Sequence, residues 1–267
     1  MPLAVCATPI GNLEDVTLRV LAQLAAADLV LCEDTRRTRV LLQRHGIAAR
    51  LSSYHEHNEA RRTAEVLPRL EAGETIALVS DAGLPGVNDP GMRLIAAARD
   101  AGLLVTVLPG PSAVETALVA SGFELERYRF LGFLPRGDRA LASLWDELSS
   151  SSDSAVAFES PQRLPATLAS LAAAMPERPV AVCRELTKAF EEVVRGPART
   201  VAARFDAAPK GEITLVLGPA PPRGVPDRVG LEAVTELVGE GVPRRKAADV
   251  VSRLTGLPKN RLYRDTL

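Results

Sequence analysis

Cysteine is scarce in this sequence, and the cysteines that occur are not paired. The chain has three, Cys6, Cys32 and Cys183, each standing alone inside an apolar run, and no CxxC pair is present. Structural zinc sites and disulfide frameworks are built from closely spaced pairs. The sequence therefore argues against both, and we expect three buried thiols that pack as small apolar side chains.

Long apolar runs are also missing. No run approaches the ~20 residues that a membrane-spanning helix needs. The first residues, MPLAVCATPIG, contain no basic segment followed by a long apolar stretch, so we expect no signal peptide. The expectation is a cytoplasmic protein without a membrane segment.

A charge of one sign and two nucleotide-binding fingerprints are absent as well. The formal net charge is −1, so no overall field draws in nucleic acid. Neither GxGxxG nor GxxxxGKS/T occurs, which argues against a Rossmann dinucleotide-binding fold and against a P-loop NTPase.

What the sequence does contain is an alternation of short apolar runs and helical patterns. Its 267 residues are 46% hydrophobic and 24% charged, which is typical of a globular chain with room for two compact domains. Most runs are nearly continuous apolar stretches, as expected of strands buried on both faces. The predicted strands are residues 3–8, 28–33, 75–80, 103–108, 129–134, 155–160, 179–185 and 212–218.

Helical patterns between these runs predict an α/β fold. Glycine after the last helical residue is the expected stop signal, and it follows three of the four helices predicted before residue 122. These four helices are residues 17–27, 36–45, 92–101 and 112–121.

The rhythm of the pattern changes after about residue 122, which indicates two halves. We expect an N-terminal α/β half at 1–111 and a C-terminal α/β half at 112–218. The Pro/Gly-rich residues 219–226 predict a stiff linker. Residues 227–267 then predict a small helical appendage, with helices at 229–240, 244–254 and 258–263.

The appendage is basic. Residues 241–267 carry seven Lys and Arg against two Asp, a net charge of +5, which leaves −6 for the rest of the chain. A basic tail on an acidic body is typical of contact with a polyanion, although a merely solvated basic face explains it equally well.

Four loops follow predicted strands and are rich in residues that bind small ligands. In SDAGLPGVNDPG, residues 80–91, three glycines and two prolines exclude both helix and strand. Ligands of open α/β sheets bind at the carboxyl ends of the strands, so we expect this loop to bind one. The other three loops are residues 7–17, 32–39 and 109–115.

The loop CEDTRRTR places three arginines at the start of a predicted helix, where cations oppose the helix dipole. That local cost indicates either an anionic partner or ion pairs with the preceding Glu33 and Asp34.

The segment YHEHNE, residues 54–59, holds two of the three histidines. On an extended segment His55 and His57 would share a face, and with Glu56 and Glu59 they could form a metal site. No third cluster of ligands is evident, so we expect no metal and interpret the segment as a polar surface loop lining a cleft.

Taken in order, these loops resemble those of one known family. They are similar to the ribosomal RNA small subunit methyltransferase I family, a branch of the tetrapyrrole-methylase fold. The resemblance runs over about residues 3–218, the helical tail is also of the family's type, and many blocks in register make it specific. The blocks are ATPIGNLEDVTLR, CEDTRRTRVLL, YHEHNE, LVSDAGLPGVNDPG, PGPSA, GFLPR, FESPQR, CRELTKAFEEVVRG and GEITLVLG.

One departure concerns the loop at Gly83-Leu84-Pro85. Tetrapyrrole methylases carry a GDP-type loop, and this chain has no Asp at the middle position. The rRNA branch is similar in lacking it, which argues against a porphyrin substrate. Leu84 also stands where the family has Thr, a change that alters packing more than chemistry.

The resemblance implies a two-domain tetrapyrrole-methylase-like fold, that of class III methyltransferases, with a donor cleft between the α/β halves and a small helical appendage. It implies S-adenosyl-L-methionine as the methyl donor and 2′-O-methylation of a cytidine ribose in the decoding region of 16S rRNA, in the small ribosomal subunit. It further implies a homodimer, and the appendage is then expected to dock RNA.

The same resemblance assigns residues to the donor site. Loop 80–91 contributes most of them, because small residues there let the backbone approach the methionine moiety. The cofactor-binding residues expected are Asp81, Ala82, Gly83, Leu84, Val87, Ser112, Ala113, Glu185, Leu186, Glu212 and Ile213.

The catalytic residues are less defined. A ribose 2′-hydroxyl is a weak acid, so a base within hydrogen-bond reach would help. Candidates by residue type are Glu33, Asp34, His55, His57, Glu59 and Lys188. We place Glu33 and Arg36 on the substrate side, with Arg36 holding phosphate, followed by His55 and His57.

Two alternatives stay open. One is the same fold acting on a small molecule of the tetrapyrrole type. The other is a non-enzymatic RNA-binding protein that kept the fold and lost the activity, and such a scaffold has no need to bind the donor.

Overall fold

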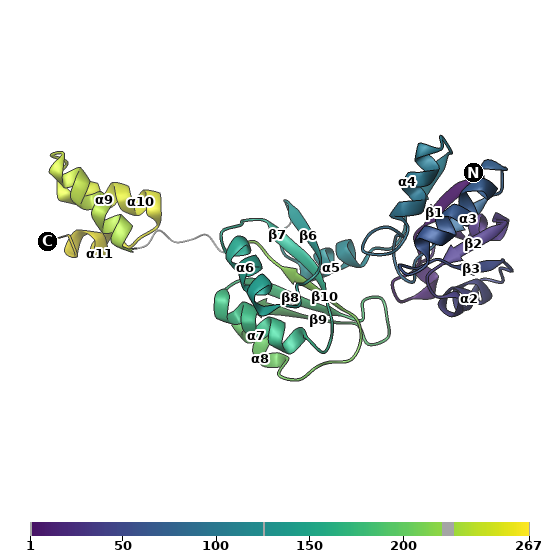
Figure 1. Cartoon of the computed structure of the whole chain (residues 1–267). Coiled ribbons are helices and arrows are strands. Elements are labelled where there is room, and N and C mark those ends of the chain that lie inside the picture. Colours follow the sequence, from purple (N-terminus) through teal and green to yellow (C-terminus); the bar gives the residue numbers. More distant parts are fainter. Residues whose placement is uncertain (1, 125, 221–226, 267) are drawn as a thin grey trace. The chain divides into compact units, whose positions relative to one another are not determined.

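The computed structural model describes residues 2–124, 126–220 and 227–266. The chain divides into a larger unit, residues 1–219, and a smaller C-terminal unit, residues 220–267 (Figure 1). Most of the expected linker, residues 221–226, lies outside the described residues. The larger unit holds both β-sheets, and the smaller unit is helical.

The first sheet has five parallel strands in the order β3-β2-β4-β1-β5. Parallel neighbours need crossover connections, which here contain helices. All carboxyl ends of the strands therefore meet at one edge. The strands are β1 (Leu3–Cys6), β2 (Leu29–Cys32), β3 (Leu51–Ser53), β4 (Ile76–Leu78) and β5 (Val105–Leu108), and the connections hold η1 (Leu13–Asp15), α1 (Leu18–Ala26), α2 (Thr35–Arg44), α3 (Glu59–Glu71) and α4 (Met92–Asp100).

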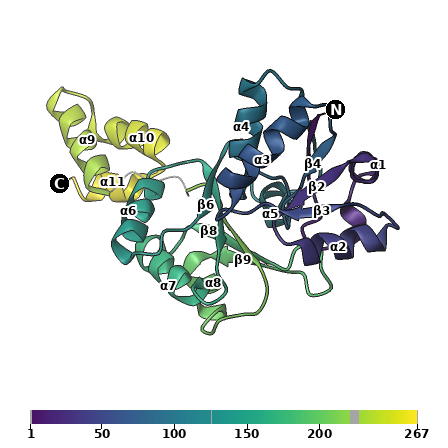
Figure 2. The same cartoon turned by 45° about the vertical axis from the view of Figure 1, so that its right-hand side comes forward.

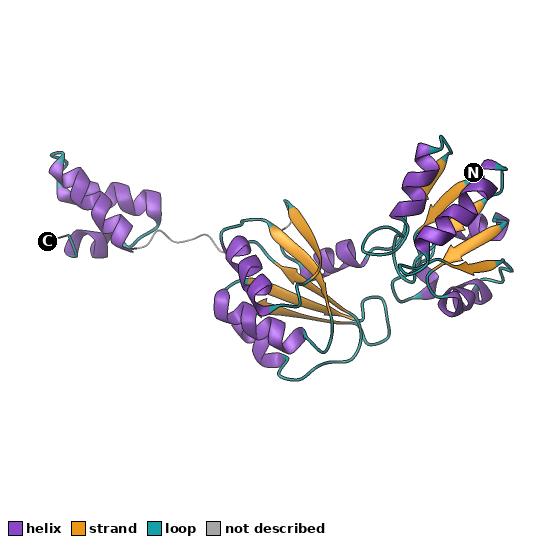
Figure 3. Ribbon diagram, viewed as in Figure 1, coloured by secondary structure: helices purple, strands orange, loops and turns teal. Residues whose placement is uncertain are grey.

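Alternate residues of these strands enter two different cores. Leu3 and Val5 of β1 pack on the side of α3 and α4, whereas Ala4 and Cys6 pack on the side of α1 and α2. Side chains of a strand point alternately to opposite faces, so a sheet covered on both faces needs continuous apolar runs. Figure 3 shows this sheet flanked by helices, and the predicted strands of this half are confirmed.

The second sheet is mixed, with strand order β6-β7-β10-β8-β9. β6 runs parallel to β7, β10 runs antiparallel to β7 and β8, and β8 runs antiparallel to β9. Ile213 at the start of β10 pairs with Glu159 and with Arg184, so the ends of β7 and β8 meet it at one edge. The strands are β6 (Tyr128–Phe133), β7 (Ser154–Glu159), β8 (Pro179–Arg184), β9 (Glu192–Pro197) and β10 (Ile213–Leu217).

Helices also cover both faces of the second sheet. α6 (Asp138–Ser149), α7 (Leu164–Ala174) and α8 (Ala198–Arg204) pack on one face against residues such as Ala155 and Leu215. α5 (Ala113–Ser121) packs on the other face against Val156 and Val216. In Figures 1 and 2 the three helices lie together on their side of the sheet.

The C-terminal unit is a three-helix cluster around a small core. Its helices are α9 (Asp227–Gly239), α10 (Arg244–Thr255) and α11 (Lys259–Arg264). The core holds Val234, Ala247, Ala248, Val251 and Leu262. A Cβ on Gly230 would lie 2.2 Å from Leu257 Cδ1, so α9 approaches this core closely at a glycine.

All eight predicted apolar runs form strands, and the three cysteines are buried as expected. Two strands, β3 and β9, are not predicted by the apolar pattern of the sequence. β3 has three residues, two of them serine, and β9 is an edge strand with Glu, Arg, Gly and Pro among its residues, so neither shows an apolar run. Across the described residues, no helix has both the length and the hydrophobicity needed to cross a bilayer.

Candidate functional site

A cavity of about 790 Å³ lies at the carboxyl edge of the first sheet. Loops after β1, β2, β4 and β5 line one side of it, and residues of β6, β7 and β10 line the other. A cavity of this size suits a cofactor or a drug-sized ligand. Nine of the eleven expected donor-binding residues line it: Asp81, Ala82, Gly83, Leu84, Val87, Ser112, Ala113, Glu212 and Ile213.

The loop after β4 is held in shape by the loop after β1. Thr8 and Gly83 exchange two backbone hydrogen bonds, of 2.8 and 3.0 Å, and the Thr8 hydroxyl donates to the carbonyl oxygen of Ser80 at 3.0 Å. Gly83 has φ +76°, a conformation that side chains with a Cβ resist. Gly83 thus lines the cavity with its main chain held at a fixed position.

Asp81 connects this loop to α2. Its Oδ1 accepts the backbone N–H of Asp34 at 3.0 Å, and its Oδ2 lies 3.3 Å from Arg37 Nη1. Arg37 lines the cavity as well, and its sequence position among three arginines does not distinguish it from its neighbours. Both carboxylate oxygens of Asp81 therefore have partners within the protein, which fixes the orientation of the side chain.

Three carboxylates, Glu33, Asp81 and Asp89, line the same cavity. Burial and the charge of Asp81 raise the pKa of Glu33 above its ordinary value. Burial also raises the pKa of Asp89, to about 6, and the charges of Glu33 and Asp81 act in the same direction. Like charges held together in a partly desolvated site favour the protonated forms. The cavity consequently offers negative potential to a cationic ligand.

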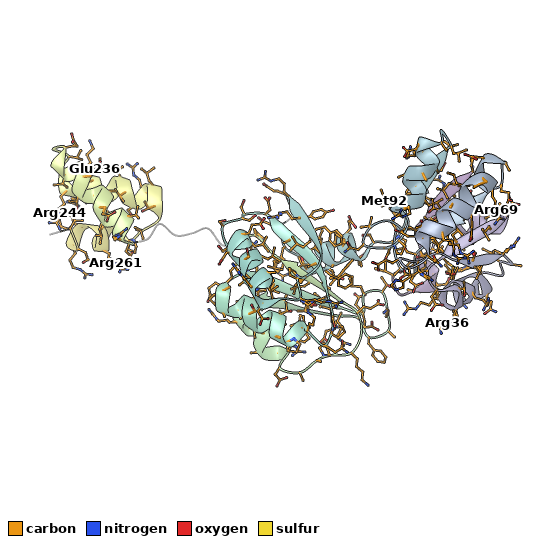
Figure 4. The ribbon with its side chains drawn as sticks, in the orientation of Figure 1. Arg36, Arg69, Met92, Glu236, Arg244 and Arg261 are labelled. Carbon is orange, nitrogen blue, oxygen red and sulfur yellow. The ribbon has the colours of Figure 1, made fainter. Side chains whose placement is uncertain are left out.

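Arg36 lies outside the lining of the cavity. Its guanidinium forms a two-pronged hydrogen bond with Asp34, from Nε to Oδ1 at 3.1 Å and from Nη2 to Oδ2 at 2.7 Å, and its side chain is 85% exposed. Figure 4 labels it on α2. Asp34 also caps α2 by accepting the N–H of Arg36, and these bonds hold the pKa of Asp34 well below its usual range. The ion pair expected as an alternative is thus present.

Ser112 precedes α5 and is engaged locally. Its hydroxyl donates to the carboxylate of Glu115, which also accepts the Tyr128 hydroxyl at 3.0 Å. The Ser112 hydrogen bond is the main reason that the pKa of Glu115 is lowered. This chain of three side chains joins the start of α5 to β6 at the cavity wall.

Glu185 and Leu186, also expected at the donor site, do not line the cavity. Leu186 is buried in the core between α5 and the second sheet. Glu185 accepts the backbone N–H of Glu212 at 2.9 Å and the Lys188 ammonium at 2.7 Å, and the same ammonium lies 2.9 Å from Glu212 Oε2. Lys188 therefore bridges the carboxylates of Glu185 and Glu212. Glu185 does not touch the cavity itself but binds Glu212, which lines it.

His55 and His57 are not brought to the cavity wall. Their rings lie 6.0 Å apart, His57 is exposed, and Asn58 accepts the His55 backbone N–H at 2.9 Å. The influence of His55 on the site is electrostatic, because its charge acts to lower the pKa of Glu33. In the described part of the chain, no group of three or more His, Cys, Asp or Glu side chains could hold a metal ion.

An aromatic wall on the second sheet was not found from the sequence. Phe130 and Phe133 of β6 both meet the ring of Phe158 edge-on, at centroid distances of 5.2 and 5.5 Å, and all three line the cavity. Phe133 is 64% exposed. The composition of a strand does not reveal that its rings face a ligand site, because core phenylalanines have the same spacing.

Comparison with known proteins decides the family. The model of the tetrapyrrole (corrin/porphyrin) methylases matches residues 2–202. The chain belongs to this family of methylases. The relatives most similar in sequence include ribosomal RNA small subunit methyltransferase I of Mesorhizobium japonicum, 44% identical over 99% of this chain and 91% of that protein, and of Micromonospora olivasterospora, 43% identical over 96% and 83%. This methylase is therefore a member of the ribosomal RNA small subunit methyltransferase I family.

A third relative is shorter. Ribosomal RNA small subunit methyltransferase I of Thermotoga maritima is 43% identical over 216 residues, which cover 80% of this methylase and 97% of the relative. About a fifth of this methylase thus lies outside the match, although nearly the whole relative is matched.

Solved structures share the fold. The methyltransferase CobJ superposes with a TM-score of 0.62 at 20% identity, over 82% of this methylase and 94% of CobJ. Uroporphyrin-III C-methyltransferase from Thermus thermophilus, in a structure with S-adenosyl homocysteine, gives 0.57 at 17% identity, over 81% and 96%. These likenesses confirm the two-sheet fold expected from the sequence.

The family's methyl donor is S-adenosyl-L-methionine, and the residues of the cavity suit it. The donor is a cation at its sulfur, and it carries a charged methionine end and an adenosine whose planar base can pack on apolar surface. Asp81 provides negative charge, and Leu84 and Val87 provide apolar surface. The residues that line the cavity are thus compatible with the expected cofactor.

Proposed function

We propose that this methyltransferase transfers a methyl group from S-adenosylmethionine to the ribose 2′-oxygen of a cytidine in the decoding region of 16S rRNA. The observation that carries the proposal is the acidic cavity at the sheet edge. It lies in a chain whose relatives at 43–44% identity bear the name ribosomal RNA small subunit methyltransferase I.

The donor is proposed to bind along loop 80–91 and the start of α5. S-adenosylmethionine supplies a methyl group activated by a positive sulfur. The carboxylate of Asp81, held by Arg37, faces that charge, and Gly83 lets the main chain approach the methionine end. Ser112 and Ala113 bound the other side, where the hydrogen bond of Ser112 to Glu115 fixes the wall.

The substrate side is proposed at Glu33 and α2. Glu33 lines the cavity and can accept a hydrogen bond from the ribose. RNA phosphates are repelled by the carboxylates inside and attracted by the exposed arginines of α2, of which Arg36 is one. Ribose would then enter the cavity while phosphate stays outside. We rank His55 and His57 after these two residues, because neither lines the cavity as Glu33 does and a guanidinium suits phosphate better than an imidazole does.

Positioning accounts for much of the expected rate. Holding the ribose oxygen ~3–3.5 Å from the methyl carbon, in line, replaces a random encounter by a near-attack geometry. The 2′-hydroxyl also distinguishes RNA from DNA, and a nucleotide of a structured RNA must leave its stack to enter such a site. The exposed ring of Phe133 on the cavity wall offers an unstacked base a surface to stack on.

The C-terminal unit is proposed to dock RNA. Several of its cations are already paired, such as Arg261 with Asp227 at 2.7 Å and Lys259 with Asp249 at 2.5 Å. Arg245 and Lys246, at the start of α10, are exposed, and no ion pair involves them among the residues that the structure describes. Exposed unpaired cations at a helix N-terminus favour contact with a polyanion.

Two further properties belong to the proposal. An enzyme of ribosomal RNA works in the cytoplasm. A homodimer is supported by exposed apolar side chains at the edge of the first sheet: Val107 of the edge strand β5 is 46% exposed, and Leu104, just before β5, is 60% exposed. Sedimentation of the purified chain would decide between a monomer and a dimer.

The deciding experiment has two steps. Calorimetric titration with S-adenosylmethionine should give saturable binding, weakened in Asp81→Ala, which a scaffold without activity would not show. Tritium transfer from labelled donor to small ribosomal subunits, followed by ribose-methylation mapping, should place the label on one cytidine. Label on a base, or on an added tetrapyrrole instead of rRNA, would refute the proposal.

A second pair of variants tests the substrate side. Glu33→Ala and Arg36→Ala should keep the wild-type affinity for the donor and lose methylation of rRNA. Unchanged turnover in both variants would remove these residues from the mechanism.

A further inference from the structure

Asp89 lines the cavity, although its loop position alone does not mark it as functional. It is half-buried, between β4 and α4, and shares the cavity wall with Glu33 and Asp81. The following residues hold it in place: Gly91 has φ +147°, and a Cβ there would lie 3.1 Å from Leu78 Cδ2. The backbone that carries Asp89 is therefore constrained on its C-terminal side.

The three carboxylates differ in what they bind. Asp81 has both oxygens occupied, by the Asp34 N–H and by Arg37. Glu33 is also stabilised as an anion by Arg37 and by the backbone N–H of Asp81. No lysine, arginine or histidine of the described ranges pairs with Asp89. The nearby Ser80 hydroxyl, which acts to lower the pKa of Asp89, donates to the carbonyl oxygens of Ala82 and Gly83. It is the carboxylate of the three with the least compensation for its charge.

The surroundings of Asp89 make it a better proton acceptor than an ordinary aspartate. Burial, and then the charge of Glu33, raise its pKa to about 6, with Asp81 acting in the same direction and Ser80 against it. General bases work best when their pKa lies near the working pH, because they are then deprotonated and still basic.

The other acidic groups of the wall are committed elsewhere. Each accepts hydrogen bonds from neighbouring side chains of the protein. Glu115 accepts from Ser112 and Tyr128, Glu159 accepts from Thr167 at 2.7 Å, and Glu212 accepts from Lys188 at 2.9 Å.

We propose that Asp89 is the proton acceptor of the methyl transfer, taking the proton of the attacking ribose hydroxyl within the cavity. As the oxygen–carbon bond forms, the sulfur–carbon bond breaks and its electron pair stays on sulfur, which leaves a neutral thioether. The proton on Asp89 then passes to water. The inference rests on the proposed function, because it needs a hydroxyl as the methyl acceptor.

The first test is Asp89→Asn, which keeps the shape and removes the basic oxygen. With small ribosomal subunits that lack the methyl group and saturating donor, the single-turnover rate should fall ~10²–10⁴-fold, the range of general acid–base catalysis. Donor affinity by calorimetry should stay within about twofold. Asp100→Asn, at the exposed end of α4, is the matched control and should keep the wild-type rate.

The pH dependence gives a second reading. The wild-type rate should rise about tenfold per pH unit below ~6 and then level off, and Asp89→Asn should lose this dependence. An unchanged rate in Asp89→Asn would overturn the proposal, and so would a loss of donor binding, since Asp89 would then be a donor-binding residue.

A third reading needs no activity. Carbon-13 NMR of labelled aspartates in the full chain should show one carboxyl titrating near pH 6 that disappears in Asp89→Asn. Glu33→Gln should move that titration to lower pH, because the Glu33 charge raises the pKa. An Asp89 that titrates near 4 in the wild type would refute the inference. An inactive wild type with an Asp89 titrating near 6 would refute only the substrate.

Discussion

The guanidinium of Arg178 donates a hydrogen bond of 3.0 Å to the carbonyl oxygen of Leu148, in the last turn of α6. The same side chain donates to the carbonyl oxygens of Ser151 at 3.1 Å and Asp153 at 2.9 Å. Arg178 is 2% exposed, and burial lowers its pKa to about 10, so it stays charged at neutral pH. One buried cation thus joins the end of α6 to the segment that enters β7.

Replacing Arg178 by Met should be strongly destabilising. Met keeps much of the apolar stem but donates no hydrogen bond, so three carbonyl groups lose a charged donor at once. A buried polar group left without its partner costs ~1–3 kcal/mol, and we expect the free energy of unfolding to fall by about 3 kcal/mol. Urea denaturation of both proteins measures this difference.

Arg199→Met is the matched control for that experiment. Arg199 forms an ion pair with Glu177, but its side chain is 59% exposed, and exposed pairs contribute ~0–1 kcal/mol. Equal losses in Arg178→Met and Arg199→Met would show that the buried network contributes nothing beyond a surface charge.

The sequence predicts the strands well because their cause is local. Leu3, Val5 and their neighbours alternate between two cores, and a sheet covered on both faces leaves no polar position in the run. This rule does not apply to β9. As an edge strand it needs only one apolar face, so Arg195 is tolerated in its middle. A one-sided strand of six residues is not distinguishable from a loop by composition.

The site is only partly predictable for a related reason. Loop 80–91 is recognisable because its glycines and prolines exclude helix and strand, and it does line the cavity. Which charged side chains turn inward depends on tertiary pairing: of two adjacent arginines, Arg37 reaches Asp81 at the cavity and Arg36 turns to Asp34. His55 and His57 follow the neighbouring strand β3 but do not line the cavity. A position in a loop at a strand end therefore does not by itself place a residue in the site.

Asp81→Asn should weaken donor binding. The substitution keeps the size of the side chain, removes its negative charge and breaks the pair with Arg37. Hydrogen bonds to charged groups contribute ~1.5–3 kcal/mol, so the dissociation constant for S-adenosylmethionine should rise about 10- to 150-fold. Calorimetry measures the change, with Asp100→Asn as the control for loss of one charge. An unchanged dissociation constant would exclude Asp81 from the donor site.

Lys188→Met should destabilise the protein in a pH-dependent way. The hydrogen bond from Lys188 lowers the pKa of Glu185 below its ordinary value, with the Glu212 N–H acting in the same direction. A carboxylate whose folded-state pKa is depressed stabilises the fold above its unfolded pKa of ~4.3 and loses that contribution as the pH falls further. The difference in Tm between wild type and Lys188→Met should be present at pH 7 and shrink below pH ~4.

Lys210→Met, which removes an exposed lysine from the same region, controls for net charge. A Tm difference for Lys188→Met that is constant from pH 7 to pH 3 would mean that the ammonium acts through packing of its stem, and not through Glu185.

The double substitution Arg245→Gln and Lys246→Gln should weaken binding to small ribosomal subunits without affecting the donor. Both side chains are exposed, so the core of the C-terminal unit around Ala247 and Val251 should persist, which circular dichroism can verify. Each phosphate contact contributes ~0.7–0.9 to the slope of log affinity against log salt, so the slope should become shallower by about 1.4 to 1.8 for two lost contacts. Binding titrations between about 50 and 200 mM salt, where phosphate contacts affect affinity strongly, measure this slope.

Truncation after Pro219 makes the same test more severe. The larger unit has its own hydrophobic cores. A shorter protein of this family also exists, because 80% of this chain matches 97% of the relative from Thermotoga maritima. The truncated protein should keep its donor affinity and lose subunit affinity further than the double variant does. If both variants bind subunits as tightly as the wild type at every salt concentration, the C-terminal unit does not contact RNA and its basic residues are merely solvated. The arginines of α2 would then be the remaining candidates for RNA contact.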